Sequence, residues 1–195
     1  MRFLKTTVIF VLLASVSPVW AIDFDIWKTG LSRQEIINIA KENNIPLSKN
    51  GLNHTSKNFN PKLIGGEVNS FYYKTQLLGH PARVRLYLSP RKGKYGQFLY
   101  EVEVLFTSLI KNKDLKPYLE ELLKKKYGRG SFGTNLIQTF RVWNPEKDAE
   151  VRLIKGPGVL QLKYTDLKIK SIAEQLSKST YSLPAPSKHG DAGKF

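Results

Sequence analysis

The chain contains no cysteine, and this absence removes several kinds of chemistry at once. Disulfide bonds, thiolate zinc sites, cysteine nucleophiles and a lipid-modified N-terminal cysteine are all excluded. The three histidines, His54, His80 and His189, are too far apart in sequence to form a typical zinc-ligand motif. We therefore expect a fold held by packing alone, with no metal and no cofactor.

Long hydrophobic runs are also rare, and the clearest one lies at the N-terminus. Thr6–Val16 carries no charge, follows Arg2 and Lys5, and is shorter than the ~20 residues that a membrane-spanning helix needs. Val19 and Ala21 then supply small residues at the −3 and −1 positions of a cleavage site. We predict that residues 1–21 are a signal peptide cleaved after Ala21. The protein is then exported, periplasmic or secreted, and does not span a membrane.

Acidic residues are few, since 16 Asp and Glu stand against 31 Lys and Arg, for a formal net charge of +15. Removal of Arg2 and Lys5 with the leader, which holds no acid, leaves +13. Such a charge favours an anionic partner, for example an anionic lipid, a glycan or an acidic protein. Nucleic acid is not expected as a partner because export separates the protein from it.

The first part of the mature chain, 22–110, predicts a helix followed by strands. Ser32 and Glu35 form a capping box at the helix start, and the helix should end near 43–44. Its apolar positions are Ile36, Ile37, Ile39 and Ala40. The polar segment 46–70 is long for a structureless loop. It is either a surface loop or contains a short strand near 63–64.

Alternating apolar residues predict a hairpin of two strands, 82–88 and 98–106, with a neighbouring strand at 71–78. The expected core faces are Ala82, Val84, Leu86 and Leu88 on one strand and Phe98, Tyr100, Val102, Val104 and Phe106 on the other. The matching register pairs Val84 with Val102, Leu86 with Tyr100, Arg85 with Glu101, and Arg83 with Glu103. The two arginines would then form cross-strand ion pairs on the outer face.

The second part, 111–176, repeats this order of elements. Asp114 is the expected cap of a helix that ends at Gly128, with an apolar face of Leu115, Tyr118, Leu119, Leu122 and Leu123. Three strands follow, at 140–143, 149–154 and 159–164. The turn 155–158 should place Val151 opposite Leu162, Leu153 opposite Leu160, and Glu150 beside Lys163.

Asp166 should then cap a last short helix with apolar positions Ile169, Ile172, Ala173 and Leu176. Residues 177–195 have few apolar side chains and are predicted to be a disordered tail.

Two hairpin segments match each other at four of five positions. Ala82-Arg83-Val84-Arg85-Leu86 resembles Ala149-Glu150-Val151-Arg152-Leu153, and each belongs to the first arm of a hairpin. The shared order of helix, strand, strand, strand indicates a duplication. The predicted fold class is α+β, with two related units, an antiparallel sheet, and the helices packed on one face.

This arrangement resembles the tandem helix-plus-sheet modules of exported proteins such as β-lactamase inhibitor protein. The segment Gly30-Leu31-Ser32-Arg33-Gln34-Glu35-Ile36 also resembles the helix start of BamE-type envelope proteins. The chain departs from the latter because it has no lipidated cysteine and because Asn44-Ile45-Pro46 lacks their glycine. The resemblance implies a binding or scaffolding module without an active site, and it transfers no functional residue.

Residues 128–133 fit the pattern G-x-G-x-x-G, but they follow a helix and precede a strand, so a helix stop and a loop explain these glycines better than a nucleotide site. The carboxylates are expected beside basic residues, which leaves no clear acid–base couple. We therefore expect a protein that is not an enzyme. The alternative enzyme is a hydrolase built from His54, His80 and scattered carboxylates.

Two basic clusters are the candidate anion-binding residues: Arg91, Lys92 and Lys94 in the hairpin loop, and Lys124, Lys125, Lys126 and Arg129 at the C-terminal end of the second helix. A purely structural interpretation also exists, because cations stabilise a helix C-terminus. The function expected from the sequence is an exported, non-enzymatic interaction module of the cell envelope, contacting a protein or another envelope component through its sheet or loops. Binding of a polyanion such as anionic lipid or lipopolysaccharide is the alternative. If both clusters lie at one end of the molecule, binding is favoured.

Overall fold

The computed structural model describes residues 23–49, 52–53, 69–91, 96–106 and 114–181. The signal peptide, its cleavage site, the segment near 63–64 and residues 182–195 lie outside this part of the chain. The helices are α1 (Arg33–Glu42), α2 (Leu115–Tyr127) and α3 (Leu167–Tyr181). The first strands are β1 (Asp23–Phe24), β2 (Trp27–Lys28), β3 (Ser48–Lys49), β4 (Leu52–Asn53), β5 (Ser70–Leu77), β6 (His80–Leu88) and β7 (Leu99–Phe106). The others are β8 (Ser131–Thr134), β9 (Thr139–Glu146), β10 (Ala149–Gly156) and β11 (Val159–Asp166).

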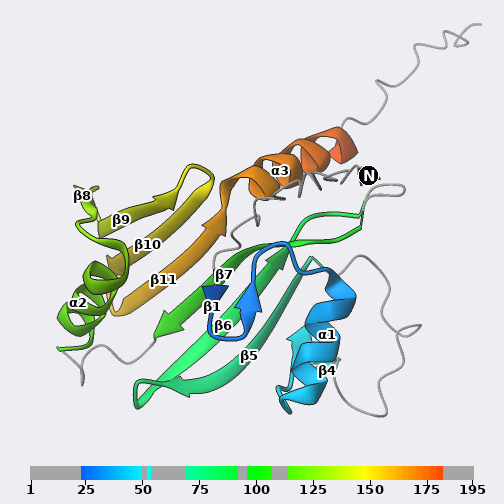
Figure 1. Ribbon diagram of the computed structural model, residues 1–195, viewed down its shortest axis with the longest axis horizontal. Helices are drawn as coiled ribbons and strands as arrows, with labels where there is room; N and C mark the ends of the chain where they lie inside the picture. The colour runs from blue at the N-terminus through cyan, green and yellow to red at the C-terminus, as the bar shows by residue number, and fades with distance from the viewer. Residues whose placement is uncertain (1–22, 50–51, 54–68, 92–95, 107–113, 182–195) are drawn as a thin grey trace, which may run out of the picture.

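One antiparallel sheet runs through the molecule in the order β4-β3-β5-β6-β7-β11-β10-β9-β8 (Figure 1). The predicted α+β class is confirmed. Two meanders, β5-β6-β7 and β9-β10-β11, meet where β7 pairs with β11. The short strands β3 and β4 pair with each other within the segment 46–70. The sequence had predicted either a surface loop there or a short strand near 63–64.

One face of the sheet carries the hydrophobic core. The alternating side chains of β6, β7, β10 and β11 are buried there with one side of α1 and one side of α2. The hairpin β1–β2 adds Trp27, which is completely buried and donates a hydrogen bond from Nε1 to the Tyr73 hydroxyl at 2.8 Å. The strand residues of this hydrophobic core include Val84, Leu86, Val102, Val104, Val151, Leu153, Leu160, Leu162 and Tyr164.

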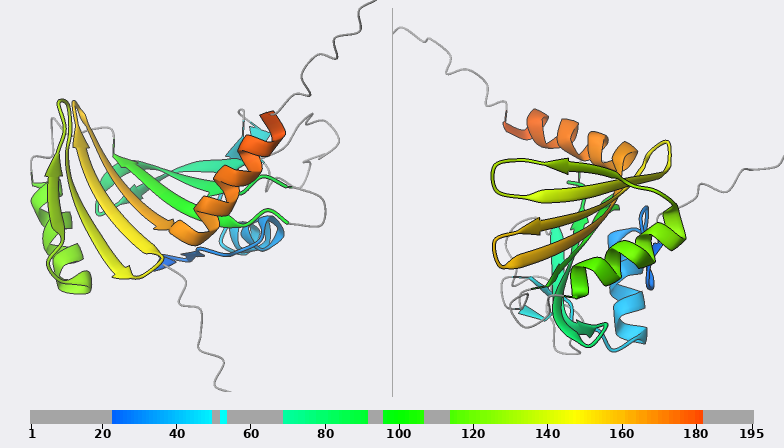
Figure 2. Two further views of the ribbon diagram at one scale, coloured as in Figure 1. Left: turned by 90° about the horizontal axis from the view of Figure 1, so that it is seen from above. Right: turned by 90° about the vertical axis from the view of Figure 1, so that its left-hand side faces the viewer.

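The third helix lies on the opposite face, so the expectation that all helices pack on one face is wrong for α3. Lys170 of α3 reaches Glu101, which belongs to the polar side of β7. Figure 2 shows α2 and α3 on opposite sides of β9–β11. The physical reason is that α3 follows β11 directly. Asp166 accepts a hydrogen bond from the Ile169 amide at 2.9 Å, and the helix turns back over the polar face.

Both predicted hairpin registers are wrong by two residues. Val84 faces Val104, Leu86 faces Val102 and Arg85 faces Glu103, while Arg83 lies opposite Leu105. Because the error is even, each side chain keeps its predicted face. The predicted faces fail only near a β-bulge. There the register shifts between Tyr87, which pairs with Glu101, and Leu88, which pairs with Leu99. Leu99 therefore enters the core, while Phe98 is exposed and Tyr100 lies beside Tyr87.

The register of β10 and β11 is set by a shorter turn than the one predicted. Only Pro157 and Gly158 separate the paired residues Gly156 and Val159, and Gly158 has φ +70°. A proline followed by a glycine with positive φ is typical of a type II turn. The resulting pairs are Val151 with Tyr164, Leu153 with Leu162, Arg152 with Lys163, and Glu150 with Thr165.

The predicted helix caps and boundaries are confirmed only in part. Gly128 terminates α2 with φ +79° as predicted, but Asp114 makes no side-chain cap because its own backbone is already helical. Tyr118 and Leu122 were expected on the buried face and are exposed instead. Helix α3 continues to Tyr181, so the predicted tail boundary at 177 is wrong. Ser177 supports the extra turn by donating its hydroxyl to the Ala173 carbonyl at 2.9 Å.

The capping box of α1 is confirmed and yields a first prediction. Ser32 Oγ accepts from the Glu35 amide at 3.3 Å, and Glu35 Oε2 accepts from the Ser32 amide at 2.7 Å. We expect Ser32→Ala to lower the free energy of unfolding by about 1 kcal/mol, because a first-turn amide loses its partner. Urea denaturation measures this, with Gln34→Ala on the exposed side of α1 as the control. Equal stability of Ser32→Ala and the wild type would contradict the prediction.

Candidate functional site

A layer of charged side chains lies between the sheet and α3. Glu101 and Glu103 point to the same face of β7, and both are buried. Lys163 Nζ lies 3.3 Å from a Glu101 oxygen and 3.2 Å from a Glu103 oxygen. Arg85 reaches Glu103 at 3.7 Å, and Lys170 reaches Glu101 at 3.6 Å. These two carboxylates are therefore compensated mainly from β11 and α3. Of the two arginines that the sequence suggested, Arg85 adds the longer contact to Glu103, whereas Arg83 lies opposite Leu105.

The electrostatics of this layer follow from burial and pairing. Burial of the Lys163 ammonium lowers its pKa, but the attraction of Glu101 and Glu103 and their hydrogen bonds outweigh burial, so the pKa is raised overall. A cavity of about 320 Å³ lies beside these groups, lined by both acids and bases, including Glu150, Arg152 and Glu174. Since cations and carboxylates alternate around it, we interpret the layer as the contact that attaches α3 to the sheet.

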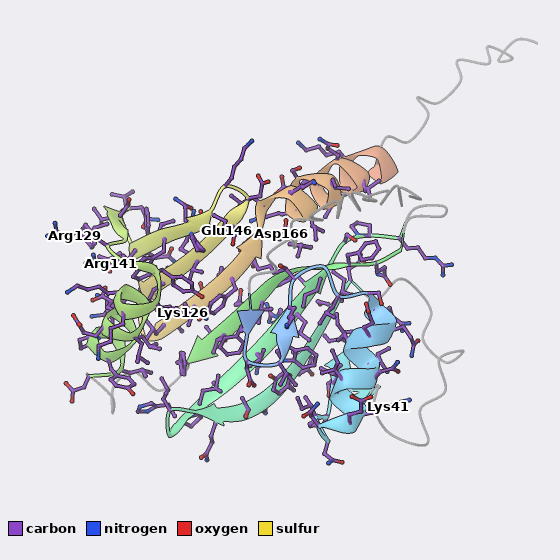
Figure 3. The ribbon with its side chains drawn as sticks, viewed as in Figure 1. Lys41, Lys126, Arg129, Arg141, Glu146 and Asp166 are labelled. Atoms are coloured by element: carbon purple, nitrogen blue, oxygen red, sulfur yellow. The ribbon has the colours of Figure 1, made fainter. Side chains whose placement is uncertain are left out.

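The second predicted basic cluster lies at the C-terminal end of α2. Lys124, Lys125, Lys126 and Arg129 are all exposed. Lys124 pairs with Glu121 at 3.5 Å, and Lys126 lies over the Tyr127 ring. Figure 3 shows Lys126 and Arg129 at the same end of the molecule as β8.

The first predicted cluster is not brought to this end. Arg91 follows β6, in the half of the sheet that α1 covers, whereas α2 and β8 lie at the other end (Figure 1). Lys92 and Lys94 lie outside the described residues. The two basic clusters are therefore separate surfaces as far as the described residues show, and only the α2 cluster is placed in full.

The glycines after α2 have a packing role that the sequence did not reveal. A Cβ atom at Gly130 would lie 2.6 Å from the Trp143 ring, and one at Gly133 would lie 2.4 Å from the Phe140 ring. Both distances are shorter than real Cβ contacts, so the rings require glycine here. The expectation that a flexible loop explains these glycines is wrong for Gly133, which lies in strand β8.

The sequence analysis did not predict the exposed apolar side chains that lie near the C-terminal end of α2. Phe132 is 63% exposed, Leu136 104% and Ile137 70%. All three belong to the β8–β9 hairpin, whose outer strand β8 is an edge of the sheet. The available signal was the apolar pair Leu136-Ile137 in a short polar turn, where exposed side chains are expected.

The β8–β9 loop is ordered by hydrogen bonds from one side chain. Asn135 Oδ1 accepts from the amides of Ile137 at 3.1 Å and Gln138 at 2.7 Å. The Asn135 amide donates to the Gln138 carbonyl at 2.9 Å. The loop thus holds Leu136 and Ile137 in solvent in a defined conformation. We call the set Lys124, Lys125, Lys126, Arg129, Phe132, Leu136 and Ile137 the basic end surface.

The predicted histidine site is not assembled in the described residues. His80 begins β6 opposite Leu77, and His54 and His189 lie outside the described part. No group of three metal-ligating side chains is found in the ranges that the structure covers. Within the same ranges, no helix combines the length and the apolar character needed to cross a bilayer.

Fold and site together define an α+β protein with two meanders in one sheet and a basic surface with an apolar tip at one end. Comparison of the chain with protein-family models, with curated proteins and with solved structures finds no match.

Proposed function

We propose that this protein is an exported, non-enzymatic binding module of the cell envelope, and that the basic end surface is where it binds. The observation that carries the proposal is the exposure of Phe132, Leu136 and Ile137 on one ordered hairpin next to four exposed cations. Exposed large apolar side chains that gather at one place mark interaction sites. The proposed export follows from the N-terminal sequence alone.

The chemistry of the surface favours an anionic partner, which was the alternative in the sequence analysis. Between Glu121 and Glu146 the chain has five basic residues and no acidic residue. This stretch contains the end of α2, all of β8 and most of β9. Lys124 pairs with Glu121 and Arg141 with Glu120, but Lys125, Lys126 and Arg129 leave an excess of positive charge, so a partner that binds there gains from negative charge of its own.

We further propose that the two meanders arose by duplication of one helix–β–β–β unit. Arg85, Glu103, Lys163 and Arg152 form one row across β6, β7, β11 and β10. A two-fold axis between Glu103 and Lys163 relates Arg85 to Arg152. The same axis relates Val84 to Val151 and Leu86 to Leu153, which is the correspondence that the matching sequences give. The agreement of register and sequence supports the proposal.

Photo-crosslinking in the native envelope tests the proposed binding surface. A benzoylphenylalanine at position 132 should yield crosslinked adducts, because Phe132 is exposed within the surface. The control is the same reagent at Ile172 on α3, which is also exposed, at 46%, but lies outside the surface. Adducts at 132 that disappear when Lys125, Lys126 and Arg129 are changed to glutamate support the proposal. Equal adducts at both positions, or none at 132, contradict it.

A further inference from the structure

We infer that the basic end surface docks on an anionic lipid bilayer, with the tip of the β8–β9 hairpin inserted at the boundary between headgroups and acyl chains. This inference rests on the proposed function and names its partner. Leu136 and Ile137 occupy adjacent positions at the tip, and the exposed fraction of Leu136 shows that its side chain makes almost no contact within the protein. Such side chains gain free energy in an apolar phase without any rearrangement of the fold.

Three of the four backbone amides of the loop 135–138 are already hydrogen-bonded within it. Unpaired amides are costly to bring out of water. Asn135 Oδ1 accepts from the Ile137 and Gln138 amides, and the Asn135 amide is paired with the Gln138 carbonyl. These bonds are internal to the loop and persist when water is removed. The loop therefore presents its two apolar side chains at a low desolvation cost.

Cations lie beside the tip and at the far end of β8. Lys155 of β10 is exposed and pairs in register with Thr139, the first residue after the loop. At the other end of β8 lie Lys124, Lys125, Lys126 and Arg129. The four residues of β8 rise about 3.3 Å each, so both groups can contact lipid headgroups in one footprint. Each basic residue near an anionic leaflet strengthens binding about fivefold.

The observations favour a bilayer over a strand that pairs with the free edge of β8. That edge has only four residues, whereas the largest exposed apolar side chains lie beyond it at the tip. A pairing strand would cover the edge and leave Leu136 and Ile137 in water. A bilayer accounts for the tip, for its internal hydrogen bonds and for the absence of acidic residues from the chain segment 122–145.

Vesicle binding tests the inference with the chain expressed with its own leader and purified after secretion. The protein should bind vesicles made of equal parts phosphatidylcholine and phosphatidylglycerol, and should bind phosphatidylcholine alone much less. The double variant Leu136→Ser, Ile137→Ser should lose about tenfold or more in affinity, because two apolar side chains no longer insert. Its matched control, Ile172→Ser on α3, should bind as the wild type does.

The contribution of charge to vesicle binding and the insertion of the tip are measured by separate experiments. Changing Lys125, Lys126 and Arg129 to glutamine should weaken binding about a hundredfold at low salt, and this difference should shrink near 1 M salt, where the screening length is about 3 Å. A Leu136→Trp variant reports insertion, since Trp27 and Trp143 are buried and contribute a constant background. Its emission should shift to the blue and be quenched by brominated lipid chains.

Three results would overturn the inference. The first is wild-type affinity of the tip variant for anionic vesicles, which would show binding by charge alone. The second is absence of vesicle binding while position 132 still crosslinks to a protein, in which case the proposed function survives and the lipid partner does not. The third is a concentration-dependent dimer that the tip variant abolishes, which would assign the tip to a second copy of the chain. Loss of both the vesicle binding and the crosslinks contradicts the proposed function as well.

Discussion

Replacement of Lys163 by methionine is expected to lower the free energy of unfolding by about 3 kcal/mol. The Lys163 ammonium lies within 3.3 Å of both Glu101 and Glu103, and both carboxylates are buried. Methionine fills similar space but leaves two buried negative charges, whose remaining partners are the more distant cations Arg85 and Lys170 and the hydroxyls of Thr165 and Tyr87. Chemical denaturation at neutral pH measures the loss.

The controls separate charge from packing. Lys155→Met removes an exposed cation from β10 and should change the free energy of unfolding by less than about 0.5 kcal/mol. Adding Glu101→Gln and Glu103→Gln to Lys163→Met should restore part of the stability, because the unpaired charges are then gone. A Lys163→Met protein as stable as the Lys155→Met control would show that the charged layer contributes nothing.

Lys163 also makes the free energy of unfolding depend on pH in the alkaline range. The pKa of Lys163 is raised in the folded protein above the ordinary value of 10.5, because the pull of Glu101 and Glu103 exceeds the effect of burial. A raised pKa means that the charged form is favoured by folding. Its contribution is complete below the unfolded-state pKa and is lost as pH rises through the folded-state pKa. The stability difference between wild type and Lys163→Met should therefore narrow above about pH 10.5.

Replacement of Trp27 by alanine is expected to cost about 4 kcal/mol, the largest effect of any single change proposed for the core. Trp27 has no exposed surface, and its ring packs against Tyr73 with 6.1 Å between the ring centroids. The truncation leaves a cavity in the core and removes the hydrogen bond from Nε1 to the Tyr73 hydroxyl. Thermal or urea unfolding followed by circular dichroism measures the change.

The control for Trp27 keeps the aromatic ring. Trp27→Phe loses the hydrogen bond and part of the volume, and should cost about 1–2 kcal/mol. If alanine and phenylalanine cost the same, the contribution of Trp27 comes from its hydrogen bond and not from packing. Leu136→Ala should leave the stability unchanged because that side chain is fully exposed, so it tests whether the assay responds to burial.

Local patterns predicted the elements of this protein well. The Ser32–Glu35 capping box, the glycine at the end of α2, and the alternation in β6 and β10 each depend on neighbours a few residues away. Period-two alternation also assigned most strand side chains to the correct face, since a register error of two residues preserves it. The helices and the long strands β5, β6, β7, β9, β10 and β11 could therefore be read from the sequence, whereas the short strands β1–β4 and β8 were not predicted.

Candidate site residues were predictable only in part. The basic residues at the C-terminal end of α2 form a visible run in the sequence, Lys124-Lys125-Lys126, and their exposure was expected. The apolar tip was not predicted, because a loop of four residues between Thr134 and Thr139 carries no periodicity that distinguishes a buried side chain from an exposed one. Glu101 and Glu103 were expected on an open face, since nothing near them in the sequence indicates that α3 covers them.

By itself, the sequence determined the α+β class, the start of α1, the end of α2, and the alternation that divides each strand into two faces, because these properties arise from dihedral preferences and short-range hydrogen bonds. Tertiary structure alone decided the registers, because a bulge at Tyr87 and Leu88 and a tight turn at Pro157-Gly158 shift them without changing the pattern. It also decided that α3 lies over the polar face, where Lys170 meets Glu101 from 69 positions away in the chain. Contacts at that separation depend on the path of the whole sheet, which no local pattern encodes.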